Sequence, residues 1–389
     1  MSSRLVAPSD SSTASSNVPI VSGKAEIKQL CDLAARGLEP MFDPATKLYC
    51  QRYLRQDGGQ DNGMVRQGVS YRYSIMSFLG LLEYERSGGK SPIPLRAAIE
   101  NLVDQSAAAK SVDNIGDLGL LLWLCAKAAP ERLPNVQRDF TIESALDRYE
   151  GAHEGNTMEL SWFLTGLSYA AVSPGGSAGN WRQLAERTYA SLRRNQGGFG
   201  FFGHSGTSGT LAAKLRGRIG SFADQVYPIY AYSKYGTAFE SNTALNEAKN
   251  CAAAICKVQG SLGQWWWHYD SVTGRVVQRY PVYSVHQHAM APMALIAVNQ
   301  AAKCDFSEAM FKGLRWIYGA NELNTPTLDS SLAVAWRAIQ PQSKLRLRAA
   351  QATAYLRFPD ESGSPGPLKM LYECWPYELG WLLYAFSNY

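Results

Sequence analysis

Polar and aromatic residues that could do acid–base chemistry recur along the chain, each time just before an apolar stretch. The clusters are Tyr71-Arg72-Tyr73-Ser74, Asn114-Ile-Gly-Asp117, Asn156-Thr-Met-Glu159, Asp224-Gln225-Val-Tyr227, His286-Gln287-His288, Asp329-Ser330 and Glu373-Cys-Trp375-Pro-Tyr377-Glu378. Runs of apolar and small residues follow them, as at 118–124 and 289–298. If the repeat closes on itself, polar groups at equivalent points of each unit converge, so we expect one concave site.

The titratable residues of these clusters suit an enzyme that moves protons, and cleavage or epimerisation of a sugar is one chemistry that needs such residues. Hydrolysis of a glycosidic bond needs two carboxylates that flank the bond. A lyase or an epimerase instead needs a Tyr or His that abstracts the proton beside a carboxylate, and a cation that neutralises that carboxylate. The second chemistry accounts for the Tyr, His and Arg residues together, with Arg72 and Arg218 as candidate cations.

This chemistry gives each candidate residue a role. The predicted catalytic residues are His286, Tyr227, Asp224, Glu159 and Glu378. The predicted substrate-binding residues are Arg72, Tyr71, Trp265, Trp266, His268, Gln287, Tyr283 and Trp375. Arg72 would hold the negative group, His286 and Tyr227 would move protons, and the tryptophans would stack on the sugar ring.

Simpler structural roles compete for some of these residues. Asn114, Asn156 and Asp329 stand where a helix is expected to begin, and their side chains could accept hydrogen bonds from free backbone N–H groups there. Core packing is the simpler role for the aromatic members of the clusters. Neither role accounts for Arg72 or His286.

No metal and no cofactor is expected. The spacing His286-x-His288 suits a pair of metal ligands only in an extended segment, because side chains two positions apart on a helix diverge by about 200°. The glycine-rich segments follow helices rather than strands, so they do not have the context of a phosphate loop or a dinucleotide fingerprint.

The elements that must position the clusters are helices that arrive in pairs. The first helix of a pair is amphipathic, and these helices are 24–37, 95–105, 181–194, 240–257 and 306–318. The second is nearly all apolar, and these helices begin near Ser70, Asn114, Asn156, Gly220, Ser284, Leu328 and Cys374. Successive starts lie 42–46 residues apart, or 64 where an insertion enlarges the unit.

Apolar helices must be covered on most sides, whereas amphipathic helices expose one face. The alternation therefore predicts an inner ring of helices within an outer ring. The expected fold is all-α, an α/α toroid of six or seven helical hairpins with two small β-hairpin or loop insertions. A last pair beginning near Ser343 would make the seventh hairpin. An open solenoid of helix pairs is the alternative.

Two insertions enlarge the third and fourth intervals, and strands are expected only near 196–219 and 260–283. In the second insertion, Trp266–Asp270 and Arg275–Tyr280 flank Thr273-Gly274, which predicts a β-hairpin. Successive side chains of an extended segment alternate, so at least one of three consecutive tryptophans at 265–267 should face the mouth or solvent. All five histidines also fall at this end of the units, namely His153, His204, His268, His286 and His288.

The overall composition argues against several classes of partner. A formal charge of +5 on 389 residues, without a cluster of Lys and Arg, predicts no nucleic-acid partner. No apolar run is long enough to span a membrane. Seven cysteines, an odd number without a CxxC pair, suit reduced thiols in a cytoplasmic protein. We expect a disordered Ser-rich tail at 1–22 and a single toroid domain at 23–389, with the oligomeric state left open.

The helical repeat resembles that of the six-hairpin glycosidase-like toroids, which include glycoside hydrolases, polysaccharide lyases and uronyl epimerases. The segment Tyr283-Ser-Val-His-Gln-His-Ala-Met-Ala-Pro-Met-Ala294 is similar to the small-residue inner helix of a glucuronyl epimerase, although it lacks the Gly-Gln pair of that family. The resemblance implies a carbohydrate-active enzyme, whether lyase, hydrolase or epimerase. Its substrate would be an acidic or hydroxyl-rich poly- or oligosaccharide bound in the central cavity.

A second resemblance points to other toroids. Gln196-Gly-Gly-Phe-Gly and Gln259-x3-Gly263-x-Trp265 are similar to the Gln–Trp repeats of squalene/hopene-type cyclases and to the Gly-Gly-Phe-Gly turns of protein prenyltransferases. It implies terpenoid cyclisation or prenyl transfer. The chain lacks the Asp-x-Asp-Asp proton donor, the Asp-Asp-x-x-Asp metal box and a recognisable zinc-ligand set. A toroid that binds glycans without turnover is a further alternative.

Overall fold

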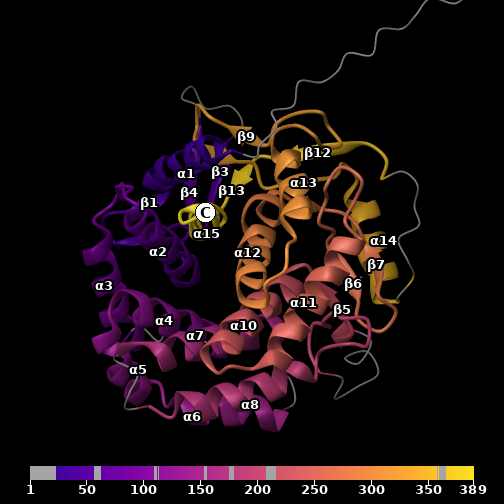
Figure 1. Ribbon diagram of the computed structural model, residues 1–389. Helices are drawn as coiled ribbons and strands as arrows, with labels where there is room; N and C mark the ends of the chain where they lie inside the picture. The colour runs from indigo at the N-terminus through magenta and orange to yellow at the C-terminus, as the bar shows by residue number, and fades with distance from the viewer. Residues whose placement is uncertain are drawn as a thin grey trace, which may run out of the picture.

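The computed structural model describes residues 23–56, 63–108, 112, 114–152, 156–174, 179–206, 216–356, 358 and 365–389. The tail predicted at 1–22 and His153 lie outside these described residues. Helical hairpins surround one axis, with an inner ring of helices inside an outer ring (Figure 1).

Six inner helices form a closed ring. They are α2 (Tyr71–Arg86), α4 (Ile115–Ala128), α7 (Thr157–Val172), α10 (Ala223–Ala238), α12 (Ala291–Ala302), which a π-helical turn (His286–Met290) precedes, and α15 (Pro376–Phe386). Each inner helix contacts the next in this order, and α15 contacts α2. The predicted closure of the repeat into a toroid is confirmed, and an open solenoid is excluded.

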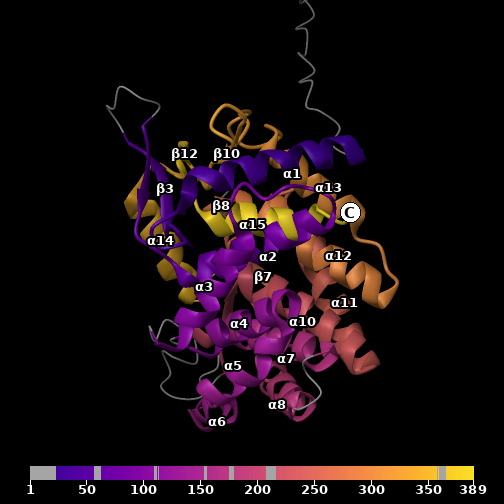
Figure 2. The same cartoon turned by 90° about the vertical axis from the view of Figure 1, so that its left-hand side faces the viewer.

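The outer ring covers the inner one. Its helices are α1 (Lys24–Leu38), α3 (Leu95–Ala108), α6 (Ile142–Ala152), α8 (Trp181–Arg193), α11 (Asn242–Lys257) and α13 (Ser307–Ile317). A short helix, α5 (Leu133–Asp139), connects α4 to α6. The first outer helix, α1, packs on α15 as well as α2, so segments from both ends of the described chain lie side by side (Figure 2).

Small residues let the inner helices approach closely. A Cβ atom at Gly80 would collide with the carbonyl oxygen of Gly380, which lies on α15. A Cβ atom at Gly119 would collide with the backbone of Phe163 on α7. Glycine is otherwise unfavourable inside a helix, so these two positions are explained by the packing of the ring.

Aromatic side chains fill the axis of the ring below the starts of the inner helices. Trp123 and Trp381 stack with their ring centroids 5.3 Å apart. The indole of Trp381 donates a hydrogen bond to the hydroxyl of Tyr227 at 3.0 Å. The axis is therefore a packed core and not a pore.

Three tyrosine hydroxyls meet further along the axis. Tyr169, Tyr230 and Tyr384 come from α7, α10 and α15, and their hydroxyl oxygens are 2.8, 2.8 and 3.1 Å apart. All three rings pack around Trp123, and the ammonium group of Lys127 lies 5.0 Å from the centre of the Tyr169 ring. We call these three residues the tyrosine triangle.

The strands form small antiparallel sheets at the cavity end of the inner helices. One sheet joins β5 (Ile219–Ser221), β6 (His268–Asp270) and β7 (Arg275–Gln278), and a second joins β8 (Val282–Tyr283), β11 (Ala338–Pro341) and β12 (Leu368–Leu371). A third sheet joins β3 (Arg52–Arg55), β4 (Met64–Gln67) and β13 (Glu373–Cys374). Two further sheets have two strands each: β1 (Phe42–Asp43) pairs with β2 (Leu48–Tyr49), and β9 (Leu328–Asp329) pairs with β10 (Val334–Ala335).

The β-hairpin predicted in the second insertion is confirmed. Strands β6 and β7 pair antiparallel, with Asp270 opposite Arg275. Gly274 in the turn between them has a φ of 68°, which only glycine adopts readily. The expectation that strands occur only in the two insertions is wrong, because β1–β4 and β9–β13 lie elsewhere.

Of the six or seven hairpins expected, the described chain forms six, and the inner helix predicted near Leu328 is wrong. No inner helix begins near Leu328, because that residue opens β9, and Asp329 accepts hydrogen bonds from the backbone N–H groups of Ser331 and Leu332 in the following turn. The apolar run there is short, and periodicity alone does not distinguish a short buried strand from a helix. The sixth hairpin is therefore α13 with α15, separated by a long connection.

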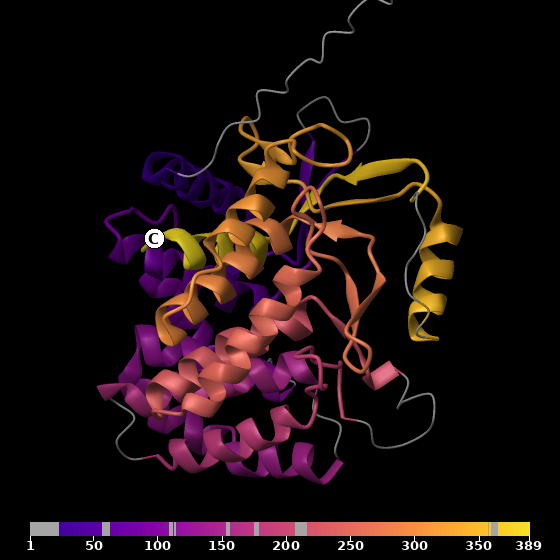
Figure 3. The same ribbon diagram turned by 45° about the vertical axis from the view of Figure 1, so that its right-hand side comes forward.

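Helix α14 (Lys344–Tyr355) belongs to that connection and lies outside the ring, beside the β5–β6–β7 sheet (Figure 3). It packs through Ala354 and Tyr355 against Ile219 and Val277, and most of its other side chains are exposed. The segment that contains α14 connects strands β11 and β12, which pair with each other. The two ends of this segment lie close together, since the Gln342 N–H donates to the Pro367 carbonyl at 2.9 Å.

Two further features concern the described chain as a whole. All seven cysteines are free thiols, five of them buried. No helix among the described residues is both long enough and apolar enough to cross a lipid bilayer.

Candidate functional site

A cavity of about 340 Å³ opens at the end of the ring where the inner helices begin. Its polar and aromatic wall residues include Arg72, Tyr73, Trp162, His204, Arg216, Tyr227, Trp267, His268, Tyr283, His286, Arg337, Trp375 and Tyr377. The first turns of α2, α7, α10 and α15 and the π-helical turn all contribute. Five of the seven clusters that recur in the sequence thus contribute to one cavity, whereas those at 114–117 and 329–330 do not line it.

Arg72 and Arg337 are guanidinium groups fixed in the cavity wall by buried carboxylates. Arg72 donates two hydrogen bonds to Asp117, from Nε at 2.6 Å and from Nη2 at 3.0 Å. Arg337 forms an ion pair with Glu378 and lies flat on Trp375, with its guanidinium carbon 3.4 Å from the ring centre. Arginine has five N–H donors, so both groups retain donors for a ligand.

Arg216 completes the cationic wall. Its Nη1 donates to the carbonyl of Ile219 at 2.9 Å, and its guanidinium group lies 5.0 Å from the centre of the Tyr355 ring on α14. Helix α14 therefore contributes to the cavity indirectly, by holding a wall residue.

Flat rings line another part of the wall. Trp267 stacks nearly parallel to His286, at 15° and 5.9 Å, and Tyr283 packs against both rings. Burial lowers the pKa of His286 to about 3, so the ring is neutral. Its Nδ1 is buried and has no hydrogen-bond partner within the described structure.

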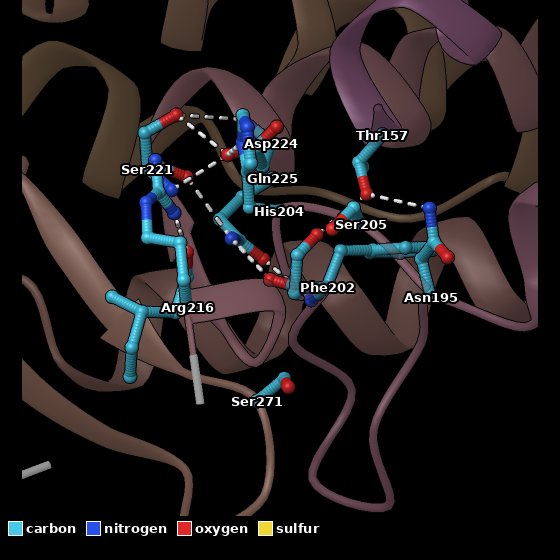
Figure 4. A network of polar contacts seen from close by, with 12 residues as sticks. Thr157, Asn195, Phe202, His204, Ser205, Arg216, Ser221, Asp224, Gln225 and Ser271 are labelled. Carbon is cyan, nitrogen blue, oxygen red and sulfur yellow. Dashed lines mark hydrogen bonds and ion pairs between the residues drawn. The ribbon is translucent and has the colours of Figure 1, made fainter. Parts of the chain in front are cut away.

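His204 and Asp224 form a hydrogen-bonded pair at the cavity wall (Figure 4). Asp224 is 2% exposed and accepts from the backbone N–H and the hydroxyl of Ser221 at 2.8 and 2.9 Å, and His204 Nδ1 lies 3.3 Å from the same oxygen. An ionised carboxylate only accepts hydrogen bonds. The proton of the neutral imidazole therefore lies on Nδ1, which leaves Nε2 as the basic nitrogen.

The first insertion holds His204 in this position. The N–H of Thr157 at the start of α7 donates to the His204 carbonyl at 2.8 Å. Gln225 on α10 binds both backbone groups of Phe202, accepting from its N–H at 2.7 Å and donating to its carbonyl at 2.9 Å (Figure 4). Two inner helices thus fix the loop, and the loop fixes the imidazole.

His268 is held in one tautomer by the second insertion. The amide nitrogen of Gln278 donates to the Tyr280 carbonyl at 2.9 Å, so the amide oxygen accepts from His268 Nδ1 at 2.7 Å. Burial lowers the pKa of His268 to about 4. Its Nε2 is therefore an unprotonated acceptor.

Of the predicted site residues, six lie in the cavity wall and seven do not. Those in the wall are Arg72, Tyr227, His268, Tyr283, His286 and Trp375. Asp224 and Glu378 lie behind the wall and hold His204 and Arg337. Burial raises the pKa of Glu378 to about 7, although Arg337 acts in the opposite direction.

Four predicted substrate-binding residues point elsewhere. Tyr71 faces α3, where its hydroxyl lies 3.5 Å from Gln105, and Gln287 is fully buried with its amide donating to the Tyr283 carbonyl. Trp265 is fully buried against Phe222, and the indole of Trp266 donates to the Val258 carbonyl. The alternation of the tryptophans was expected, but it directs Trp267 to the cavity and not the other two.

Glu159, the last predicted catalytic residue, lines a neighbouring cavity instead of the central one. Arg218 does not line the central cavity either. Of the three proposed caps, Asn114 does cap its helix, by accepting from the Asp117 N–H at 2.9 Å. Asn156 makes no such capping bond.

Sequence reasoning missed Arg216 and Arg337 as wall residues, and it noted His204 only as one of five histidines at this end. It included Trp267 only as one of three consecutive tryptophans, without singling it out. Arg337 carries no local signal, because it lies between β10 and β11 and its partner Glu378 is 41 positions away.

Two negative observations limit the chemistry. Among the residues that the structure describes, no Asp or Glu lines the central cavity. Within the same residues, no group of three or more His, Cys, Asp or Glu side chains is arranged to hold a metal ion. His286 and His288 do not act together, because His288 lies in the core with Nε2 3.3 Å from the Glu378 carbonyl oxygen.

No protein-family model and no curated protein matches the sequence. Solved structures do match the fold over nearly the whole chain. The unsaturated glucuronyl hydrolase of Bacillus sp. GL1, described as responsible for degradation of glycosaminoglycan, is 14% identical with a TM-score of 0.58, covering 94% of this chain and 96% of its own. A possible GH105 family member from Salmonella enterica is 10% identical with a TM-score of 0.59, covering 98% of both chains.

A third similar structure is the GH76A α-1,6-mannanase of Salegentibacter sp. HEL1_6. It is 11% identical with a TM-score of 0.53, covering 93% of this chain and 98% of its own. An inactive variant of that mannanase, in which two consecutive aspartates are replaced by alanine, has been solved with α-1,6-mannotetrose. At these identities the likeness establishes the fold: the chain is an α/α toroid of the kind found in these glycosidases.

Proposed function

We propose that this protein is an enzyme that acts on an acidic saccharide bound in the central cavity. The observation that carries the proposal is a wall with three guanidinium groups, Arg72, Arg216 and Arg337, among flat aromatic rings and without a carboxylate among the described lining residues. Guanidinium groups bind carboxylates in a bidentate manner, and aromatic rings stack on sugar rings. The similar solved structures include enzymes named as glucuronyl hydrolases, which supports the same substrate class.

The proposed reaction is proton transfer at the sugar carbon beside the carboxylate. His204 Nε2 would remove the proton, and the negative charge would spread into the carboxylate held by Arg337. The intermediate would then expel its C4 substituent, whose oxygen takes the proton from His204, as in a lyase, or regain a proton on the opposite face from the Tyr227 hydroxyl, as in an epimerase. Tyr227 and the ring of His286 line the cavity and would contact the substrate.

Hydrolysis is the second candidate, because the solved structures that share the fold are named as hydrolases. The arrangement required for two flanking carboxylates is not seen in the described cavity wall. The chain also lacks consecutive aspartates such as those replaced in the inactive mannanase.

The test is a substrate panel with product analysis. Saturated and unsaturated uronate-containing oligosaccharides are compared with neutral manno-oligosaccharides. A new double bond detected by ultraviolet absorbance identifies a lyase, an inverted C5 proton detected by NMR identifies an epimerase, and a new reducing end without either identifies a hydrolase. Turnover of neutral sugars alone would overturn the acidic-substrate proposal.

The variant Arg337→Met sharpens that test. Removing a group that stabilises developing charge is expected to lower kcat/KM about 100-fold or more on uronates. Arg275→Met is the matched control, because Arg275 is exposed on β7 and does not line the cavity. Equal activity of the two variants would argue against a carboxylate held by Arg337.

A further inference from the structure

A second cavity, of about 470 Å³, lies between α4, α6 and α7. One part of its wall is apolar, with Ile115, Leu118 and Phe140. Polar groups face the same space from the starts of α4 and α7 and from α6, namely Asn114, Asn156, Glu159, Arg148 and Tyr149. An apolar face opposite several hydrogen-bonding groups suits a sugar ring, which has a C–H face and a rim of hydroxyls.

A chain of hydrogen bonds joins this cavity to the central one. Arg72 lines the central cavity and donates to Asp117 Oδ2 at 3.0 Å, and Asn114, which lines the second cavity, donates to the same oxygen at 3.2 Å. Helix α7 also faces both spaces, since Met158 lines the first and Glu159 the second. The two cavities are therefore neighbours, and the side chain of Asp117, bonded to Arg72 on one side and to Asn114 on the other, lies between them.

The carboxylate of Glu159 has acceptor capacity to spare. Tyr149 donates to it at 3.5 Å, which is long for a hydrogen bond from a hydroxyl. An ionised carboxylate can accept about four hydrogen bonds. Burial and the nearby Asp117 raise the pKa of Glu159, while Arg72, a hydrogen bond from the Asn156 side chain and His204 lower it. Arg72 and His204 are residues of the central cavity wall. The charged residues of the central cavity wall therefore lie close enough to Glu159 to affect its pKa.

We propose that the cavity between α4, α6 and α7 binds the sugar unit next to the one held in the central cavity. Glu159 and Asn156 would bind hydroxyl groups of this unit, and Phe140 would pack on its C–H face. The chain of the substrate would cross over the Arg72–Asp117–Asn114 hydrogen bonds. This inference rests on the proposed function, and it predicts a preference for substrates of at least two units.

The experiment compares an acidic disaccharide with the methyl glycoside of its acidic unit. The quantity of interest is the ratio of kcat/KM on the disaccharide to kcat/KM on the methyl glycoside. Ala145→Phe fills the second cavity, and Arg148→Ala and Asn156→Ala shorten side chains in its wall. Each is expected to lower the ratio about 10-fold or more, mainly through KM of the disaccharide.

Ser144→Phe is the matched control, because Ser144 is exposed on the same helix and is not among the lining residues. The two shortening variants keep the test valid if Ala145→Phe does not fold. Equal ratios in the wild type and all three variants would overturn the second binding site while leaving the proposed function intact. If the wild type turns over neither compound, calorimetry measures binding of the disaccharide to the wild type and to Arg148→Ala. The absence of binding to either protein contradicts the proposed function. Equal affinity for the two proteins contradicts the second binding site.

Discussion

The two ends of the inner ring differ in whether their polar side chains are hydrogen-bonded within the protein. At the cavity end, Arg337 keeps N–H donors, and the buried Nδ1 of His286 has no hydrogen-bond partner among the described residues. At the other end, the hydroxyls of the tyrosine triangle satisfy one another within 3.1 Å. Polar groups that are paired inside the protein contribute to stability, whereas unpaired groups in a cavity are available to a ligand. Substitutions at the two ends should therefore separate activity from stability.

The largest effect is expected from His204→Ala at the cavity end. Loss of a general base typically lowers the rate on the order of 100- to 10,000-fold. The side chain of His204 is 30% exposed, so the free energy of unfolding should change little. Steady-state kinetics and urea denaturation of the same preparation measure both quantities. Full activity of His204→Ala would remove His204 from the proposed mechanism, and Asp224→Asn should lower the rate by a smaller factor.

Acid should destabilise the cavity end. Burial lowers the pKa values of His286 to about 3 and of His268 and His288 to about 4. The unfolded chain takes up protons below about pH 6.5, whereas the folded chain does not, so stability is complete above that pH and falls as the pH drops toward 4. The loss between pH 7 and pH 5 is on the order of 2 kcal/mol per histidine.

Urea denaturation at pH 7 and pH 5 measures this loss. The variant His286→Gln should show a smaller difference between the two pH values than the wild type, because one of the three buried imidazoles is gone. A difference of the same size in wild type and variant would mean that His286 is not held neutral by the fold.

A smaller effect is expected at the closed end. Tyr230→Phe removes a hydroxyl that lies 2.8 Å from both Tyr169 and Tyr384, whose own hydroxyls still pair at 3.1 Å. The free energy of unfolding should fall by about 1 kcal/mol while kcat/KM stays within twofold. Tyr389→Phe at the exposed end of the described chain is the control. A large loss of activity in Tyr230→Phe would break the separation between the two ends.

Excision of residues 343–366, with an Asn-Gly turn joining the two strands, is expected to leave the ring folded. The ends of the excised segment are already paired, since Gln342 donates to the Pro367 carbonyl, and an Asn-Gly turn suits a two-residue hairpin. The melting temperature should change by only a few degrees. KM should rise severalfold, because Tyr355 no longer packs against Arg216. Failure of the shortened protein to fold would show that α14 is part of the core.

The repeat could be predicted because it depends on local patterns. Amphipathic and apolar helices alternate at a regular spacing, and five inner helices begin within three residues of the predicted starts. The structure of residues 328–341 could not be predicted from the sequence, because a strand there pairs with a segment far away in sequence. Ala338, for example, lies opposite Tyr283. A short apolar run adopts whichever structure its distant partner allows.

The location of the candidate site could be predicted from the sequence, but several of the residues that line it could not. The starts of the inner helices converge because the ring closes, so Arg72, Tyr227 and His286 were found from their positions. The choice of Trp267 over its two neighbours depends on contacts with distant residues, since its backbone N–H donates to the Gln278 carbonyl and its ring packs on Tyr283 and His286. Arg337 depends on a contact with Glu378 that forms only in the folded ring.

The closure of the ring by α15 also has a consequence for the order of events during biosynthesis. Helix α2 leaves the ribosome early, yet its partner α15 is about 300 residues away and is synthesised much later. Contacts at such separation form slowly because a long loop must close first. Until then the apolar faces of α1 and α2 lack their cover, and nascent chains with exposed apolar surface aggregate readily. We expect pulse-chase proteolysis to show that α1 and α2 become protected only after α15 has emerged.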